Sequence, residues 1–169
     1  NVTGSISLNH SSDIRVFNNI IATLANIPSG AWIRNNKISN LQYINYSLIE
    51  NNTIESVYQN QFCTFRNNIF PFAIPADNNT WLNNYESQNF ATLFITNTAW
   101  FAYSDNYHLQ TATAYPGTDG LQAGIYGGYY PYKEGAVPSN PHVQTKTIPL
   151  QTDVNGLINI QVKVAAQNQ

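Results

Sequence analysis

"FCTFRNNIFPF", residues 62–72, contains a pair of asparagines between two runs of apolar and aromatic residues. Such pairs recur with spacings of 17, 16, 16 and 16 residues, and they begin at Asn18, Asn35, Asn51, Asn67 and Asn83. An apolar side chain stands two positions before each pair, at Val16, Ile33, Ile49, Phe65 and Trp81. Three positions after the first Asn of each pair stand Ile21, Ile38, Ile54, Phe70 and, breaking the pattern, Glu86. The chain is therefore a repeat protein with the unit apolar-x-Asn-Asn-x-apolar.

The repeated pair predicts a sharp corner between two short strands. Asn tolerates the left-handed backbone conformation that most residues avoid, so one Asn bends a strand without ending it. A corner that returns every sixteen residues builds a solenoid, in which equivalent residues of neighbouring coils stack. Stacked amides hydrogen-bond along such a column. We therefore expect an asparagine ladder at the first position of each pair, namely Asn18, Asn35, Asn51, Asn67 and Asn83.

Two other interpretations of the asparagines are weaker. Low-complexity disorder would not keep apolar residues at fixed offsets from every pair. Acceptor patterns for N-glycosylation begin at Asn45, Asn51 and Asn78, but such short patterns arise often by chance in an Asn-rich chain.

The units "IRNNKI", "IENNTI" and "FRNNIF" resemble the coils of right-handed parallel β-helix proteins of the pectate-lyase-like type. The stretch "SDNYHLQTATAYPGTDGLQAGIYGGYYPY", residues 104–132, is similar to the closing segment of secreted β-helix proteins from Bacteroidetes. The resemblance implies an all-β, right-handed parallel β-helix, secreted or held at a bacterial cell surface. Sixteen residues per coil is fewer than is usual in that family, which implies a compact variant.

The pattern divides the chain into three parts. Residues 1–110 are predicted to form the coils, and residues 111–142 a closing segment rich in Gly, Tyr and Pro. Residues 143–169 are predicted to form a β-hairpin with a tail, because Asn155-Gly156 is a strong hairpin turn signal. The alternation of apolar residues has already begun at Ile6. A solenoid needs a capped end, so we expect further coils upstream or a partner protein at the N-terminal end.

Composition argues against several classes of protein. Charged residues make up 9% of the chain, against roughly 25% in a typical domain, and the net charge is −2. Because no basic patch is present, nucleic-acid binding is not expected. No apolar stretch approaches the ~20 residues of a membrane-spanning helix. The single cysteine, Cys63, allows no intrachain disulfide and is expected to be a small buried residue.

No motif in the sequence predicts a catalytic, metal or cofactor site. His10, His108 and His142 lie far apart, and no two share a metal-binding motif. Glycoside hydrolysis needs two carboxylates that face each other across a substrate. The charged residues Arg34, Glu50 and Arg66 occupy the same position in successive coils. They predict a column of ion pairs at the surface that fixes the register of the coils.

Aromatic residues, at 13% of the chain, are the remaining sign of a ligand. Trp81 occupies an apolar position of the repeat and is expected in the core. Tyr129, Tyr130 and Tyr132 lie in a turn-rich segment and are the candidates for stacking on sugar rings, although packing within the closing segment is the stronger expectation.

Three functional hypotheses follow. The first is a non-catalytic C-terminal portion of a secreted or cell-surface β-helix protein that binds polysaccharide or serves as a scaffold or adhesion module. The second is part of a polysaccharide lyase or hydrolase whose catalytic residues lie upstream. The third is a subunit of a surface or secretion assembly. The fold alone does not decide among them.

Overall fold

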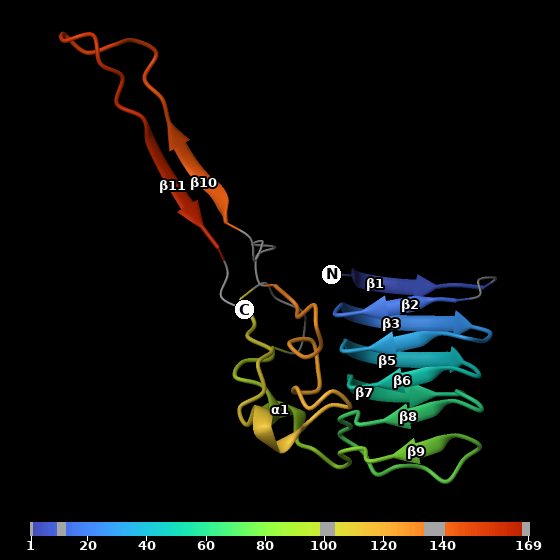
Figure 1. The fold of residues 1–169 in the computed structure, drawn as a ribbon. Helices are drawn as coiled ribbons and strands as arrows, with labels where there is room; N and C mark the ends of the chain where they lie inside the picture. The colour runs from blue at the N-terminus through green and yellow to red at the C-terminus, as the bar shows by residue number, and fades with distance from the viewer. Residues whose placement is uncertain (1, 10–12, 99–103, 134–140, 167–169) are drawn as a thin grey trace. The chain divides into compact units, whose positions relative to one another are not determined.

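The structure is a computed structural model that describes residues 2–9, 13–98, 104–133 and 141–166. The chain divides into two compact units, Asn1–Tyr132 and Lys133–Gln169. The first contains a parallel β-solenoid of about five turns, and the second is an antiparallel hairpin (Figure 1). The prediction of an all-β solenoid followed by a hairpin is therefore confirmed.

Two parallel sheets form the walls of the solenoid. The long-strand sheet has the order β1-β3-β5-β7, with strands Val2–Ser7, Ile20–Ile27, Lys37–Ile44 and Thr53–Tyr58. The short-strand sheet has the order β2-β4-β6-β8-β9, with strands Arg15–Phe17, Trp32–Arg34, Leu48–Glu50, Thr64–Arg66 and Thr80–Leu82. Equivalent residues pair across neighbouring coils, as Ile33 does with Ile49 and Ile49 with Phe65. The sixteen-residue repeat thus sets the register of the sheets.

Each coil turns at three corners, and each corner is made by one residue with a positive φ. The first corner is the first Asn of each pair, with φ between 50° and 56° at Asn18, Asn35, Asn51, Asn67 and Asn83. The second corner is at Asn26, Tyr43 and Gln59, and the third is at Asp13, Gly30, Tyr46 and Phe62. Three single-residue corners close a coil with little chain, which explains why sixteen residues are enough.

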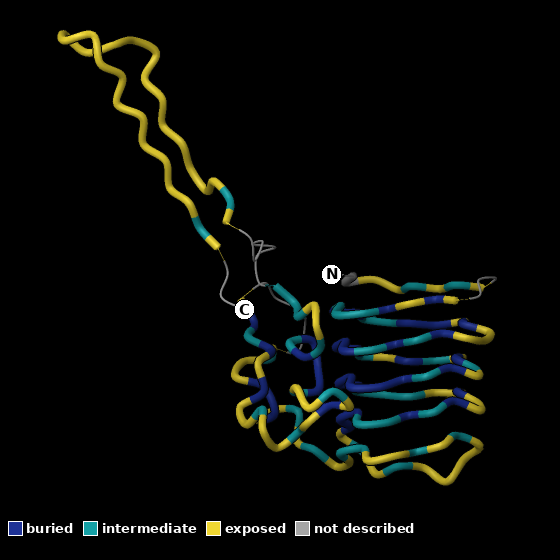
Figure 2. The backbone as a smooth tube through the Cα atoms, in the orientation of Figure 1, coloured by how far each residue is buried: buried dark blue, intermediate teal, exposed yellow. Residues whose placement is uncertain are grey.

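The core consists of stacked apolar columns that point into the solenoid. Ile33, Ile49 and Phe65 are fully buried, and the half-buried Trp81 stacks on Phe65 with ring centroids 4.2 Å apart. Burial of such side chains stabilises the fold by about 1.5–3 kcal/mol each. Figure 2 shows that the buried residues gather in the middle coils, whereas the first strand and the last coil are half-buried or exposed. The expected inward position of Trp81 agrees with this packing.

The side-chain ladder differs from the prediction in one respect: the second Asn of each pair forms it. The Oδ1 atom of Asn52 accepts hydrogen bonds from the backbone N and the Nδ2 atom of Asn36, both at 2.9 Å. The same pattern joins Asn68 to Asn52, and Asn84 to Asn68. The ladder predicted at Asn18, Asn35, Asn51, Asn67 and Asn83 is therefore wrong, because a left-handed residue directs its own side chain outward and the next residue's inward.

The outward asparagines bind a later part of the chain. Residues 115–128, here called the strap, run along the first corner of four coils. Nδ2 of Asn18 donates to the Ile125 and Gly127 carbonyls, both at 3.0 Å, and Asn67 donates to the Pro116 carbonyl, also at 3.0 Å. The other two contacts join Asn35 to the Gly124 carbonyl and Asn51 to Thr118.

A close approach requires glycine in the strap. A Cβ atom on Gly128 would lie 2.9 Å from Oδ1 of Asn35, and Gly128 has a φ of 77°.

The last solenoid strand, β9, ends at Leu82, although coils were expected as far as residue 110. The chain then forms the short helices α1 (Phe90–Leu93) and η1 (Ala112–Ala114), which lie on the same side of the solenoid as the strap (Figure 1).

The hairpin of the second unit pairs β10 (His142–Thr147) with β11 (Gln161–Ala165). The turn predicted at Asn155-Gly156 is present: Gly156 has a φ of 78°, and its amide donates to the Asp153 carbonyl. Both faces of the hairpin are exposed (Figure 2), and its exposed apolar side chains include Val143, Ile148, Leu150, Val154, Leu157, Ile158, Ile160, Val162 and Val164.

Candidate functional site

Four exposed aromatic side chains lie in two neighbouring coils, at or beside the corners that join the long-strand sheet to the short-strand sheet. Tyr43 and Tyr58 meet edge to face with centroids 5.6 Å apart, and Tyr46 and Phe62 stack with centroids 5.1 Å apart at 14°. Their exposed fractions are 41%, 54%, 61% and 51%, respectively. We call these four residues the aromatic corner. It offers large ring surfaces to a ligand that carries apolar faces.

Three of these aromatic residues have an unfavourable backbone. Tyr43, Tyr46 and Phe62 have φ values of 56°, 47° and 56°, in the left-handed region that a bulky residue rarely adopts. Such a residue costs about 1–3 kcal/mol relative to an unstrained one. The equivalent corner one coil earlier than Tyr46 is occupied by Gly30, which carries no such cost. No Asn pair marks these positions, so the sequence pattern does not predict them as corners.

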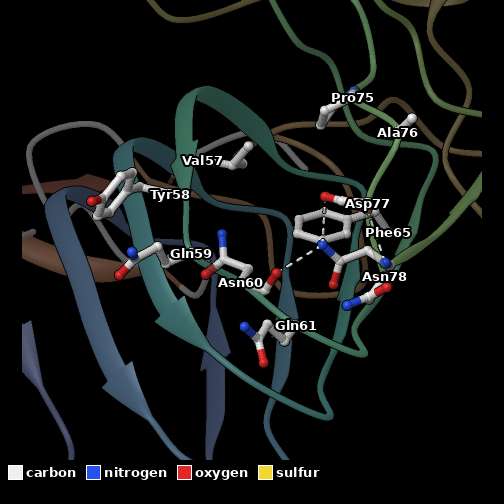
Figure 3. A pocket seen from close by; sticks show the side chains of 11 residues that line it. Val57, Tyr58, Gln59, Asn60, Gln61, Phe65, Pro75, Ala76, Asp77 and Asn78 are labelled. Atoms are coloured by element: carbon white, nitrogen blue, oxygen red, sulfur yellow. Dashed lines mark hydrogen bonds between the residues drawn. The ribbon is translucent and has the colours of Figure 1, made fainter.

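A pocket of about 530 Å³ adjoins the aromatic corner. Residues 57–61 form one wall, Pro75, Ala76, Asp77, Asn78 and Asn79 form the other, and Phe65 is also part of the lining (Figure 3). Tyr58 belongs both to this lining and to the aromatic corner. The volume lies within the range of roughly 300–1,000 Å³ for small-molecule sites.

The pocket exists because the long-strand sheet ends one coil before the short-strand sheet. Ile69 forms a parallel bridge with Thr53, but the next coil then leaves the sheet at Pro71. In a parallel ladder, the residue two positions after Ile69 would donate its amide to the Ile54 carbonyl. Proline has no amide hydrogen, so the ladder stops there. Residues 71–79 form an irregular loop, and the pocket lies between this loop and β7.

Asp77 is the acidic residue of the pocket wall, and its carboxylate holds the loop in place. Oδ1 accepts hydrogen bonds from the backbone N of Asn79 and from Nε1 of Trp81, both at 2.9 Å. Oδ2 accepts from Nδ2 of Asn79 at 2.8 Å. The remaining polar side chains of the lining are amides, apart from the Tyr58 hydroxyl: Gln59, Asn60, Gln61, Asn78 and Asn79. The arrangement can hydrogen-bond a neutral polar ligand.

The tyrosines predicted as binding residues lie apart from this pocket's lining. Tyr129 and Tyr130 are 81% and 82% exposed and follow the strap directly. Tyr132 is half-buried and packs edge to face on Tyr126 with centroids 5.8 Å apart. Whether any of the three binds a ligand stays a prediction.

The charged column is buried to a degree that the sequence did not indicate. Glu50 is 1% exposed, and its carboxylate pairs with Arg66 Nε at 2.5 Å and with Arg34 Nε at 3.6 Å. Arg34 also pairs with Asp119 of the strap at 2.6 Å. The column was predicted to point to solvent, and this is wrong for Glu50, because Trp32 Nε1 and the two arginines enclose its carboxylate. The ion pairs of the column connect the strap to three successive coils, through Arg34, Glu50 and Arg66.

A second polar group joins the later chain to β5. Lys37 is 7% exposed, pairs with Glu55 at 2.8 Å and lies 5.1 Å from the centre of the Tyr107 ring. Burial raises the pKa of Tyr107, and its hydroxyl's hydrogen bond to Asp105 raises it further. Tyr107 is thus a neutral hydrogen-bond donor. Lys37 and Tyr107 lie seventy positions apart in the chain and share no repeat position, so the sequence does not predict their contact.

Cys63 is buried, as expected. Burial raises the pKa of its thiol to about 11, and the sulfur lies 3.3 Å from the Ile44 carbonyl. A thiol this basic is a poor nucleophile at neutral pH. His108 stacks on Tyr126 and His142 lies in the hairpin, whereas His10 falls outside the described residues. Within the described ranges, no three His, Cys, Asp or Glu side chains gather as metal ligands would.

Comparison with known proteins adds no family. No protein family, curated protein or solved structure matches the chain. Among the described residues, no helix is both long and apolar enough to cross a membrane. The parallel β-solenoid is shown, and the relation to pectate-lyase-like or Bacteroidetes proteins stays a hypothesis.

Proposed function

We propose that the chain is a non-catalytic polysaccharide-binding module of a secreted or cell-surface protein, and that the aromatic corner is its binding surface. Sugar rings have apolar faces that stack on aromatic side chains and hydroxyl groups that hydrogen-bond to amides. The aromatic corner offers the first, and the adjoining pocket wall offers the second through Gln59, Gln61 and Asn78. The repeat of the coils also suits a polymer, because equivalent rings recur from one coil to the next.

The observation that carries this proposal is the left-handed backbone of the exposed aromatics. Tyr46 and Phe62 each adopt a conformation that Asn or Gly would adopt at lower cost. Their rings are more than half exposed, so burial in the core does not repay the strain. Backbone strain that is not compensated by burial of the side chain is a sign of a functional position.

The experiment replaces Tyr46 and Phe62 with Asn, which keeps the left-handed corner and removes the rings. Affinity gel electrophoresis against neutral and acidic polysaccharides measures binding of the unmodified chain and of the Tyr46→Asn/Phe62→Asn variant. We expect binding to fall about tenfold or more while stability stays equal or rises, because each lost stacking contact costs about 1 kcal/mol.

The matched control is Tyr129→Asn/Tyr130→Asn, which removes two rings that lie outside the aromatic corner and are more exposed than those of Tyr46 and Phe62. Binding by the control and by the unmodified chain, but not by the corner variant, would support the proposal. Retention of binding by the corner variant would contradict it. Loss of binding only in the control would instead assign the binding site to Tyr129 and Tyr130, which were predicted from the sequence.

The rival hypotheses give different results in the same samples. A lyase or hydrolase would release new reducing ends from a polysaccharide that the chain retards. An assembly subunit would retard no polysaccharide and would co-purify with partner proteins in fixed ratio.

A further inference from the structure

The outer edge of β7 exposes backbone groups that no strand covers. Thr53 donates its amide to the Asn36 carbonyl on the β5 side at 2.9 Å, and Ile54 donates to the Ile69 carbonyl on the opposite side at 3.0 Å. Successive residues of a strand in a parallel sheet alternate in this way. Ser56 and Tyr58 therefore direct their amides and carbonyls away from β5. No hydrogen bond joins either amide to the loop of residues 71–79, all of which the structure describes.

Because no strand lies beside the outer edge of β7, the inward side chain of Val57 is only partly covered. Leu24, Leu41 and Val57 form one column of the core. Leu24 and Leu41 are fully buried, whereas Val57 is half-buried and lines the pocket with Phe65. In the other coils, a strand on the next coil covers this column. The pocket therefore lacks one strand with an apolar side chain over Val57.

We propose that this pocket binds an extended segment of another polypeptide, which adds to the long-strand sheet as a fifth strand beside β7. The segment pairs its backbone with Ser56 and Tyr58 and places an apolar side chain on Val57. Its other side chains are polar and uncharged or carry one positive charge, because the lining holds one carboxylate, Asp77, and no cation. This proposal does not depend on polysaccharide binding, since it uses the backbone of β7 and the aromatic corner uses rings.

A peptide fits the edge better than a sugar does. Ser56 and Tyr58 present donor and acceptor groups in a row with the two-residue repeat of a strand. A partner strand supplies complementary groups at the same repeat, whereas sugar hydroxyls have no such alternation. The pocket volume of about 530 Å³ allows only a short extended segment.

The probe is an acetylated and amidated peptide, Asn-Leu-Gln-Tyr, which copies residues 40–43 of β5 and is uncharged. It ends before the position beside Ile54, which the chain's own residues after Ile69 already occupy. In parallel register its leucine lies over Val57, as Leu41 does from the other side. One control peptide is N-methylated at Leu and Tyr, whose amides would face the Ser56 and Tyr58 carbonyls of β7. A second is N-methylated at Asn and Gln, whose amides would face away.

The matched protein variants are Ser56→Pro and Ser56→Ala. Proline removes the outward amide of an edge position without breaking a backbone hydrogen bond to β5, and alanine keeps that amide. Both variants lose the hydrogen bonds of the Ser56 hydroxyl to the Ser39 carbonyl and to Asn40, so the comparison isolates the amide. Isothermal titration calorimetry on the full chain should show binding of the unmodified and the Asn/Gln-methylated peptides. Ser56→Pro, or methylation at Leu and Tyr, should weaken binding about tenfold, and Ser56→Ala should not.

A third variant, Val57→Glu, tests the same pocket independently in case Ser56→Pro does not fold, and it should also weaken binding. Circular dichroism checks the fold of each variant. The proposal is overturned if no peptide binds, or if Ser56→Pro and Val57→Glu bind as the unmodified chain does. Sedimentation velocity tests whether the chain associates with itself. Self-association that is lost in Ser56→Pro would assign the edge to a second copy of this chain and overturn its assignment to a different protein.

Discussion

The two asparagines of each pair have the same side chain and opposite roles. Asn36, Asn52 and Asn68 point inward, are fully buried and bond to one another along the solenoid axis. The first Asn of four pairs points outward, and these residues hold the strap from Pro116, bound by Asn67, to Gly127, bound by Asn18. The inner column satisfies buried backbone groups at the first corner of successive coils, whereas the outer column attaches a distant segment. The difference shows that position on the backbone, and not residue type, decides what an Asn contributes.

The inner column should show the largest effect. Asn52→Ala removes the acceptor of the Asn36 amides and the donor to the Ile33 and Glu50 carbonyls, all without access to water. Each unsatisfied buried group costs about 1–3 kcal/mol, so we expect a loss of about 3–5 kcal/mol in the free energy of unfolding. Urea denaturation measures it. A loss below that of the outer variants would remove the distinction between the columns.

The outer column should show a smaller effect that divides into two parts. Asn51→Gly keeps the left-handed corner and loses only the Thr118 contacts, at about 1 kcal/mol. Asn51→Ala also places alanine at a φ of 56°, which adds about 1–2 kcal/mol. Urea denaturation midpoints of both variants separate the loss of the Thr118 contacts from the conformational cost of alanine. The control is Asn83→Gly, because Asn83 lies outside the strap's contacts. Equal losses for Gly and Ala would contradict a conformational role of the outer Asn.

The smallest effect appears only at alkaline pH and concerns another inward position, Cys63. Below pH 9 the thiol is protonated in the folded and unfolded states and adds no pH dependence. Between pH 9 and about 11 the unfolded thiol ionises while the buried one stays neutral, so its contribution to stability falls as pH rises.

Cys63→Ser provides the matched variant, because Ser47 occupies the equivalent position and donates to the Asn45 carbonyl. We expect near-equal stability of the two proteins at pH 7 and a smaller alkaline loss in the variant. Thermal unfolding at pH 7, 9 and 11 tests this, and parallel curves for both proteins would argue against an elevated thiol pKa.

Aromatic residues show what single-sequence reasoning could not reach. Trp81 was placed inward because it shares a repeat position with Phe65. Tyr46 and Phe62 repeat at sixteen residues as well, but one coil earlier their position is Gly30, and nothing in these residue types announces a corner. The pocket could not be predicted from the sequence either, because it depends on the end of the long-strand sheet at Pro71, which has no amide hydrogen for the Ile54 carbonyl. Sequence patterns reveal positions that repeat, and a site formed where the repeat fails has no pattern of its own.

By itself, the sequence determined the parallel solenoid, its sixteen-residue coils, a left-handed Asn at each pair and the hairpin turn at Asn155-Gly156. These features are local or periodic, so residue type and spacing are sufficient to specify them. Only the tertiary structure decided which Asn forms the ladder, how deeply Glu50 is buried and where the strap lies. Each of these depends on contacts between residues far apart in the chain, such as Asn18 and Gly127, whose pairing follows from packing and leaves no periodic signal.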